Sequence, residues 1–500
     1  MATKVRINPA IGNMKKVLAF DFGASSGRAV LACACDGKLK IKEIHRFKNE
    51  PVTVNGRMYW DILRLFHEIK NGITAALHNG GFDAVSIDTW GVDFGLIDKN
   101  GELLANPVHY RDNRTEGIQN EVFKIIPEEE IYKRTGIRFM RINTLYQLMY
   151  LKLNKPRLLK NTDKFLMTPD LFAFFLTGVK KCEVSIAATT NLLNPYTRNW
   201  DYELIERLGL PTEIFPEITE AGKIYGMLSE DICRELGCKS VPVIAVAEHD
   251  TASAVVAKPF SEKNSAFISS GTWSLFGIET EKPLIDKANS GFTNECGYGN
   301  KICHIKNIMG LWLLQETRRQ WKREGRDVSF DEMEKAALSA KPFKAFIDPE
   351  DPMFEAAGNM PQRVWKYCKK TGQTLPDGDG EILRCIYDSL AMKYRQSLIE
   401  LSRETEVNYE QLNIFGGGIK DKLLCQLTAD ACEIPVIAGP TEATVIGNVK
   451  VALSAFGELD ISGKSECEEQ TVYYPNNGNV WRDYDAVYKN IIVKAGKSNA

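Results

Sequence analysis

The strongest indication of the fold is the segment Phe20-Asp21-Phe22-Gly23-Ala24-Ser25-Ser26-Gly27-Arg28. It lies between two apolar runs, residues 17–20 and 29–34, which is the pattern of a strand, a tight turn and a second strand. Two glycines and two small hydroxyls form the turn, with a carboxylate before it and a cation after it. Such a turn can bring backbone N–H groups and hydroxyls up to a phosphate, with the carboxylate placed to hold a metal ion. Each feature alone is ordinary turn chemistry, but together they indicate a nucleotide-phosphate loop that is not a Walker loop.

The composition narrows the class of protein. A chain of 500 residues is too long for one ordinary core, so we expect two or three domains. The apolar fraction of 44% and the charged fraction of 26% are typical of a soluble globular protein, and the net charge of −2 argues against nucleic acid or a membrane as partner. None of the twelve cysteines lies in a C-x-x-C pair, so no zinc site is expected. We see no secretory signal or membrane span and expect a cytoplasmic protein with reduced thiols.

The residues after the opening segment continue an α/β pattern. Residues 39–47 alternate as a third strand, residues 60–77 carry the apolar spacing of an amphipathic helix, and residues 84–87 form a buried strand. Three strands, a helix and a strand are the order of an RNase H-like unit. Further along, residues 143–153 and 169–176 indicate helices.

The opening pattern then recurs about half the chain later. Residues 266–278 again predict a strand, a turn of small residues and a strand. Aligning Gly23 with Gly271 pairs Ala24 with Thr272. We therefore predict a duplicated domain. The second half continues with predicted helices at 311–323, 381–404, 421–432 and 442–456, strands at 413–415 and 436–438, and a polar tail beyond Gly457.

A run of three glycines, Gly416 to Gly418, follows the predicted strand 413–415. It allows close approach of a ligand to the backbone, although a tight turn alone would explain it equally well. The presence of two phosphate-type turns elsewhere favours binding. The chain contains neither a G-x-x-x-x-G-K-[ST] nor a G-x-G-x-x-G motif, so P-loop and Rossmann interpretations lose their main support.

Polar residues also follow two predicted buried strands. Glu248-His249-Asp250-Thr251 ends the run 241–247, and Asp250 either accepts a proton from a substrate hydroxyl or caps the next helix. Asp88 and Asp93 flank Trp90-Gly91, where a small ligand can approach the backbone, or they are solvated carboxylates. Asn307 and Gln315 form a neutral polar pair near a helix start, for which capping and surface exposure are the alternatives.

With these residues the chain resembles the FGGY family of carbohydrate kinases, in the actin-like ATPase superfamily, from about residue 17 to 456. Besides the opening segment, the resemblance rests on Asp88-Thr89-Trp90-Gly91-Val92-Asp93-Phe94, His249-Asp250-Thr251-Ala252-Ser253-Ala254, Ser270-Gly271-Thr272-Trp273-Ser274 and Asn307-Ile308-Met309-Gly310-Leu311-Trp312-Leu313-Leu314-Gln315. It implies an α/β protein of two RNase H-like domains, with ATP and sugar in the cleft between them. The implied ranges are an extension at 1–16, domains at 17–258 and 259–457, and a packed tail at 458–500.

The resemblance also implies an activity and a set of site residues. The expected reaction is the phosphorylation of L-rhamnulose by ATP to L-rhamnulose 1-phosphate and ADP, with Mg²⁺. Asp250 is the implied general base, and Asp21 the carboxylate associated with the metal. The implied sugar contacts are Gly91, His249, Thr251 and Asn307, and the implied ATP contacts are Ala24, Ser25, Ser26, Gly27, Arg28, Thr272, Gln315, Gly417 and Gly418.

Two alternative functions remain open. The chain could phosphorylate another ketose, such as fuculose or xylulose, or be a non-kinase ATPase of the same fold; the sugar-side residues argue against the latter. We expect a monomer or a weak homo-oligomer. A relative carries a disulfide at positions matching Cys368 and Cys385, and in a cytosolic setting we expect any such bridge to be non-essential.

Overall fold

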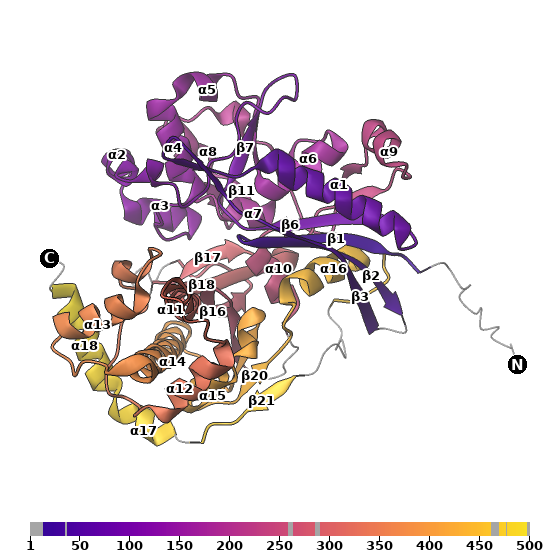
Figure 1. Cartoon of the computed structure of the whole chain (residues 1–500). Coiled ribbons are helices and arrows are strands. Elements are labelled where there is room, and N and C mark those ends of the chain that lie inside the picture. Colours follow the sequence, from indigo (N-terminus) through magenta and orange to yellow (C-terminus); the bar gives the residue numbers. More distant parts are fainter. Residues whose placement is uncertain are drawn as a thin grey trace, which may run out of the picture.

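The computed structural model describes residues 14–35, 38–258, 264–285, 291–461, 470–476 and 478–497. They form two α/β domains, each built on its own mixed sheet, and the predicted fold class is confirmed. Figure 1 shows the N-terminal domain above the C-terminal one, with the helices α10 and α16 between the two sheets.

The N-terminal sheet has the strand order β13-β14-β6-β1-β2-β3. β1 is antiparallel to β2 and parallel to β6, as the opening segment predicts for a strand-turn-strand unit followed by a crossover helix. The register places Asp21 beside Arg28 on one neighbour and beside Asp88 on the other. The six strands are β1 (Val17–Phe22), β2 (Ser26–Cys35), β3 (Lys38–Lys48), β6 (Ala84–Thr89), β13 (Ile224–Met227) and β14 (Pro242–Ile244).

The C-terminal sheet repeats this succession in the order β17-β18-β16-β15-β19-β20-β21. β15 is antiparallel to β16 and parallel to β19, just as β1 is to β2 and β6. The predicted duplication is therefore present in the strand order itself. The strands are β15 (Ser265–Ser270), β16 (Trp273–Thr280), β17 (Thr293–Cys296), β18 (Ile302–Met309), β19 (Gln411–Phe415), β20 (Val436–Ala438) and β21 (Thr471–Tyr473).

Helices cover the outer faces of both sheets (Figure 1). On the N-terminal sheet, α1 (Ile62–His78) buries Leu65 and Ile69 in the same core as Phe20 of β1. α6 (Thr168–Thr177) and α9 (Glu230–Leu236) complete this layer. The C-terminal layer consists of α11 (Trp312–Arg323), α12 (Phe330–Ser339), α13 (Met360–Lys370), α14 (Gly378–Thr405), α15 (Lys422–Cys432), α17 (Gly478–Asp483) and α18 (Asp485–Lys497).

A smaller helical region is inserted in the N-terminal domain after β6. Its helices are α2 (Ile118–Ile125), α3 (Glu128–Thr135), α4 (Thr144–Asn154), α5 (Pro156–Lys160), α7 (Val184–Ala188) and α8 (Tyr202–Arg207). Three two-stranded sheets accompany them: β7 (Phe94–Ile97) with β8 (Lys164–Met167), β9 (Lys181–Glu183) with β12 (Glu217–Thr219), and β10 (Leu193–Asn194) with β11 (Asn199–Trp200). A fourth, β4 (Val52–Val54) with β5 (Arg57–Tyr59), precedes β6 in the chain.

The two helices between the sheets pack closely. α10 (Asp250–Val256) crosses α16 (Ala443–Ala455) where a Cβ on Gly447 would lie only 1.7 Å from the carbonyl oxygen of Ser253. Beside it, the Asn448 side chain donates to Asp88 Oδ2 at 2.6 Å and to the carbonyl oxygen of Phe20 at 3.2 Å. A helix of the C-terminal domain therefore fixes the ends of two strands in the N-terminal sheet.

Several predictions of local structure differ from the structure. The predicted strand 241–247 is paired only over β14, and Asn307 lies inside β18 instead of at a helix start. The polar tail supplies β21, α17 and α18, with Trp481 and Tyr488 in the C-terminal core.

Three other predictions concern two cysteines, the domain boundaries with the chain ends, and membrane-spanning helices. Cys368 and Cys385 are free, buried thiols. Most of the predicted extension 1–16 and part of the tail lie outside the described residues, and the boundary predicted between residues 258 and 259 falls at the edge of such a segment and stays a prediction. Across the described ranges, no helix is both long and apolar enough to span a bilayer.

Candidate active site

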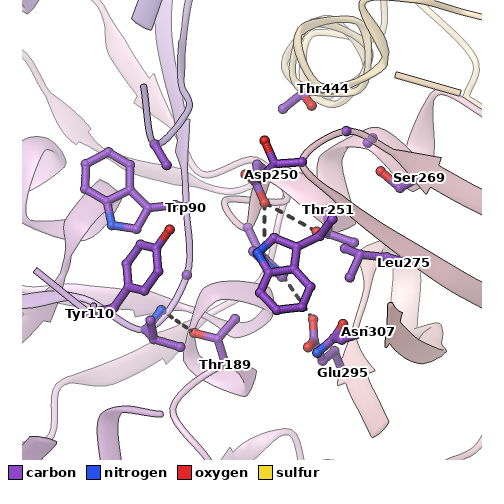
Figure 2. Close-up of a pocket in the computed structure, with 18 of the residues that line it drawn as sticks. Trp90, Tyr110, Thr189, Asp250, Thr251, Ser269, Leu275, Glu295, Asn307 and Thr444 are labelled. Atoms are coloured by element: carbon purple, nitrogen blue, oxygen red, sulfur yellow. Dashed lines mark hydrogen bonds and ion pairs between the residues drawn. The ribbon is translucent and has the colours of Figure 1, made fainter. Parts of the chain in front are cut away.

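A cavity of about 400 Å³ lies between the two domains. The N-terminal domain contributes the loop after β6, the polar loop at 110–111 and the start of α10. The C-terminal domain contributes the turn between β15 and β16, one residue each from β17 and β18, and the glycine run (Figure 2). The lining residues predicted from the sequence are Ala24, Gly91, His249, Asp250, Thr251, Thr272, Asn307 and Gly417.

Asp250 is the first residue of α10, and its side chain faces this cavity (Figure 2). The helix is capped by the backbone of His249 without a side-chain hydrogen bond, so the capping alternative for Asp250 is wrong. The carboxylate is 35% exposed and accepts a hydrogen bond from Thr251 Oγ1 at 3.3 Å. Burial raises the pKa of Asp250 above its ordinary value, nearby Asp21 adds to the rise, and His249 opposes it. A carboxylate with a raised pKa on a cavity wall can accept a proton from a hydroxyl.

His249 connects the two domains. Its Nδ1 lies 3.1 Å from Oε2 of Glu295, which is on β17 of the C-terminal domain, and its Nε2 lies 3.4 Å from Oδ1 of Asp250. Burial alone would lower the pKa of His249, but the charges of Glu295 and Asp250 outweigh it and raise the pKa above its ordinary value. The His249 ring is therefore held between two carboxylates, one from each domain.

Replacing Glu295 with glutamine is expected to lower the pKa of His249, because the opposing charge disappears and burial then dominates. A ¹H NMR titration of the histidine rings, assigned with a His249→Gln variant, measures this directly. In the unmodified protein the raised pKa stabilises the fold at low pH, and that contribution is lost as the pH rises through the raised value. Glu281→Gln, at an exposed position beyond β16, is the matched control. An unchanged titration midpoint in Glu295→Gln would contradict the assignment of this ion pair.

Side chains at the start of α7 hold the backbone around His249 through hydrogen bonds. Glu183 is fully buried and its Oε2 accepts hydrogen bonds from the N–H groups of Ser185 and Glu248, at 2.9 and 3.2 Å. Ser185 Oγ in turn accepts from the N–H of His249 at 3.2 Å. Burial raises the pKa of Glu183 to about 7. These contacts fix the backbone of residues 248 and 249 and therefore the position of Asp250, which follows them.

The loop after β6 forms the wall opposite the C-terminal sheet. Gly91 lines the cavity, and a Cβ there would lie 2.9 Å from Thr189 Cγ2, so the glycine is needed for packing. Asp93 is fully buried, not solvated, and its Oδ2 accepts from Trp60 Nε1 at 2.6 Å and Trp90 Nε1 at 3.1 Å. Burial raises its pKa to about 6. Asp93 therefore orients the Trp90 ring that forms the apolar wall.

Only Ala24 of the opening turn lines the cavity. Arg28 donates to Asp21 Oδ2 from Nε at 2.9 Å and from a terminal nitrogen at 2.7 Å, and it also pairs with Glu442 at the start of α16. A Cβ on Gly27 would lie 2.3 Å from the Phe47 ring, so this glycine serves packing. Ser25, Ser26, Gly27 and Arg28 are described but lie outside the cavity lining.

The second turn is held by the start of α11. Backbone N–H groups of Gly310 and Trp312 donate to the carbonyl oxygen of Thr272, and Thr272 Oγ1 donates to Gln315 Oε1 at 3.4 Å. Gln315 therefore lies behind the turn and not on the cavity wall.

The three glycines after β19 have different surroundings. A Cβ on Gly418 would lie 2.0 Å from Ser270 Oγ, and one on Gly416, whose φ is +90°, would lie 2.8 Å from the carbonyl oxygen of Ser270. A Cβ on Gly417 would meet nothing within 4 Å, and Gly417 lines the cavity. Gly417 is thus the glycine best placed to approach a ligand, while Gly418 is packed behind it.

The carboxylates of Asp21 and Asp88 lie side by side on neighbouring strands, in register. Asp88 is fully buried, its Oδ1 has no hydrogen-bond partner among the described residues, and burial raises its pKa. No three His, Cys, Asp or Glu side chains of the described part of the chain come together as a metal site. The carboxylates of Asp21 and Asp88 offer too few oxygen donors to surround a metal ion by themselves. Such a site suits a cation such as Mg²⁺, which keeps water and phosphate oxygens as its other ligands.

Sequence reasoning missed several residues of the wall, among them Tyr110, Arg111, Glu295 and Thr444. Tyr110 and Arg111 belong to a polar loop whose composition gave no signal beyond that of an exposed turn. Glu295 lies in a short strand without a motif, and only the pairing of β17 with β18 brings it near His249.

Family models and curated relatives match nearly the whole chain. Models of the N-terminal and C-terminal domains of the FGGY family of carbohydrate kinases match residues 16–257 and 266–456. The chain is 41% identical over 478 residues to a rhamnulokinase of Bacteroides thetaiotaomicron, covering 94% of this chain and 97% of that one. It is 42% identical over 447 residues to a rhamnulokinase of Oceanobacillus iheyensis, covering 89% and 94%.

Solved structures of other kinases share the fold. Ligand-bound xylulose kinase from Lactobacillus acidophilus superposes with a TM-score of 0.81 at 19% identity, covering 95% of this chain and 97% of that one. Glycerol kinase from Plasmodium falciparum with ADP superposes with a TM-score of 0.76 at 16% identity, covering 96% and 98%. At these identities the likeness concerns the fold alone.

Proposed function

The chain belongs to the FGGY family of carbohydrate kinases, and we propose that it transfers the γ-phosphoryl group of ATP to L-rhamnulose. The products are L-rhamnulose 1-phosphate and ADP. The observation that carries this proposal is that rhamnulokinases match nearly the whole chain, across both domains that form the cavity. The reaction consumes ATP, and we assign it to the cytoplasm. A monomer or weak homo-oligomer stays a prediction.

In the proposed mechanism Asp250 accepts the proton of the 1-hydroxyl as that oxygen attacks the γ-phosphorus. Its cavity-facing carboxylate and raised pKa support this role. Gly91, His249, Thr251 and Asn307 surround the sugar; all four are on the cavity wall. Closure of the domains around the sugar excludes water, which would otherwise compete as phosphoryl acceptor.

On the nucleotide side, the two turns that connect β1 to β2 and β15 to β16 bind the phosphates of ATP. Ala24 and Thr272, one from each turn, both line the cavity and support this arrangement. Gly417 approaches the nucleotide, and Gln315 acts by holding Thr272. Asp21 would hold the Mg²⁺ that accompanies ATP, and the ion would supply positive charge to neutralise the phosphates.

A panel of ketoses with ADP release as the readout tests the function. We expect turnover with L-rhamnulose to exceed that with L-fuculose or xylulose by about tenfold or more, because polar groups placed for one sugar lose hydrogen bonds with another. Omitting the sugar is the control, and ADP release should then fall to background. A preference for another ketose would overturn the substrate assignment, and sugar-independent hydrolysis would indicate an ATPase of the same fold.

A further inference from the structure

Among the described residues of the cavity wall, Arg111 is a cation without a carboxylate partner. Among the described lining residues, only His249 and Arg111 have basic side chains. His249 is paired with Glu295 and Asp250. Arg28, near the opening turn, is paired with Asp21 and Glu442. For the Arg111 side chain, the described part of the chain shows two aromatic rings as neighbours and no ion pair.

Aromatic rings hold the Arg111 side chain in place instead. Its guanidinium lies 5.6 Å from the centre of the Tyr110 ring and 5.1 Å from the centre of the Trp312 ring. Its backbone N–H donates to His109 Nδ1 at 2.9 Å, which fixes the loop. Stacking on ring faces orders a guanidinium while leaving N–H donors at its edge available to a planar or tetrahedral anion. The site is therefore built for a negative group that the protein itself does not supply.

The position of Trp312 indicates which anion this is. Trp312 is the first residue of α11, and its N–H donates to the carbonyl oxygen of Thr272 in the second phosphate turn. Arg111 comes from the N-terminal domain, whereas Trp312 and Thr272 belong to the C-terminal domain. The contact between Arg111 and Trp312 thus places a cation of the N-terminal domain near the phosphate turn of the C-terminal domain. Arg111 and Asp250 line the same cavity.

We propose that Arg111 binds the phosphoryl group during its transfer and then the phosphate of the product. This inference rests on the proposed kinase function. As the sugar oxygen forms its bond to the γ-phosphorus, the bond to the β-phosphate oxygen breaks, the hydroxyl proton passes to Asp250, and ADP leaves. The transferred group carries the negative charge throughout, and Arg111 donates N–H hydrogen bonds to its oxygens.

The test compares Arg111→Gln with Arg319→Gln. Arg319 lies 5.1 Å from the centre of the same Trp312 ring, but it pairs with Glu316, is half exposed and does not line the cavity. In Arg111→Gln we expect kcat to fall about 10²-fold, and calorimetric affinity for L-rhamnulose 1-phosphate to fall about 10- to 100-fold. Affinity for L-rhamnulose should change less than about twofold, and Arg319→Gln should leave all three quantities within about twofold. Arg111→Lys, which keeps the charge, should restore part of the product affinity.

Two results would overturn the inference. Equal losses of affinity for L-rhamnulose and its 1-phosphate in Arg111→Gln would make Arg111 a sugar contact. Equal effects of Arg111→Gln and Arg319→Gln would mean that both act by supporting Trp312. Failure of the proposed function is a separate outcome, because the ketose panel would then show that the unmodified protein prefers a ketose other than L-rhamnulose. In that case, the calorimetric comparison uses the ketose that the protein does phosphorylate, together with its phosphate ester.

Discussion

Replacing Asp250 with asparagine is expected to lower kcat by about two to four orders of magnitude while the fold stays intact. The amide has nearly the same shape as the carboxylate but accepts no proton, so the hydroxyl must attack without a base. The hydrogen bond from Thr251 Oγ1 can still be accepted by the amide oxygen, and His249 keeps its pairing with Glu295. Steady-state kinetics with L-rhamnulose and ATP measure the loss, and circular dichroism with a thermal scan checks the fold.

The pH dependence of kcat/KM provides a second test of Asp250 as the base. Because the pKa of Asp250 is raised, kcat/KM should fall on acidification with a midpoint above that of an ordinary aspartate, as the base becomes protonated. Asp231→Asn, at an exposed carboxylate on α9, is the control and should leave the rate and the profile unchanged. Near-normal turnover in Asp250→Asn would show that another group takes the proton.

Replacing Gly447 with alanine is expected to give the largest loss of stability, with the midpoint of thermal unfolding falling by about 5 to 10 °C. The new Cβ would lie 1.7 Å from the carbonyl oxygen of Ser253, and backbone atoms can move only if α10 and α16 separate. Separation would shift Asp250 at the start of α10 and Asn448 next to the substitution. We therefore also expect kcat to fall, by about tenfold or more, because a displacement of about 1 Å at the reacting groups is costly.

The control for this variant is Ala455→Ser at the exposed end of the same helix, which adds one atom without a neighbour to displace. Differential scanning calorimetry of the two variants separates the effect of the helix crossing from any general effect on α16. An unchanged midpoint in Gly447→Ala would mean that the crossing is looser than the structure describes, and the coupling between α16 and the active site would lose its basis.

Much of the fold followed from local sequence pattern. The strand-turn-strand at the opening segment, its recurrence at residues 266–278, and the helices of both halves are specified by period and turn chemistry, which act between near neighbours. The sequence also indicated Asp250 and the loop around Gly91 as parts of a site, because polar groups after buried strands are brought together at the same edge of a sheet. The resemblance to a kinase family added the expected roles.

Contacts between residues far apart in the chain arise only in the folded protein. Glu295, in a strand without a motif, reaches His249 only because β17 pairs at the edge of the C-terminal sheet. Arg111 has no distinguishing neighbours in sequence, yet it stacks on Trp312 of the other domain. Local propensity and hydrophobic period encode which segments become strands, turns and helices, so these elements could be predicted from the sequence. Only the packing of two domains around α10 and α16 determined which side chains meet in the cavity, because burial and ion pairing depend on distances that no local pattern records.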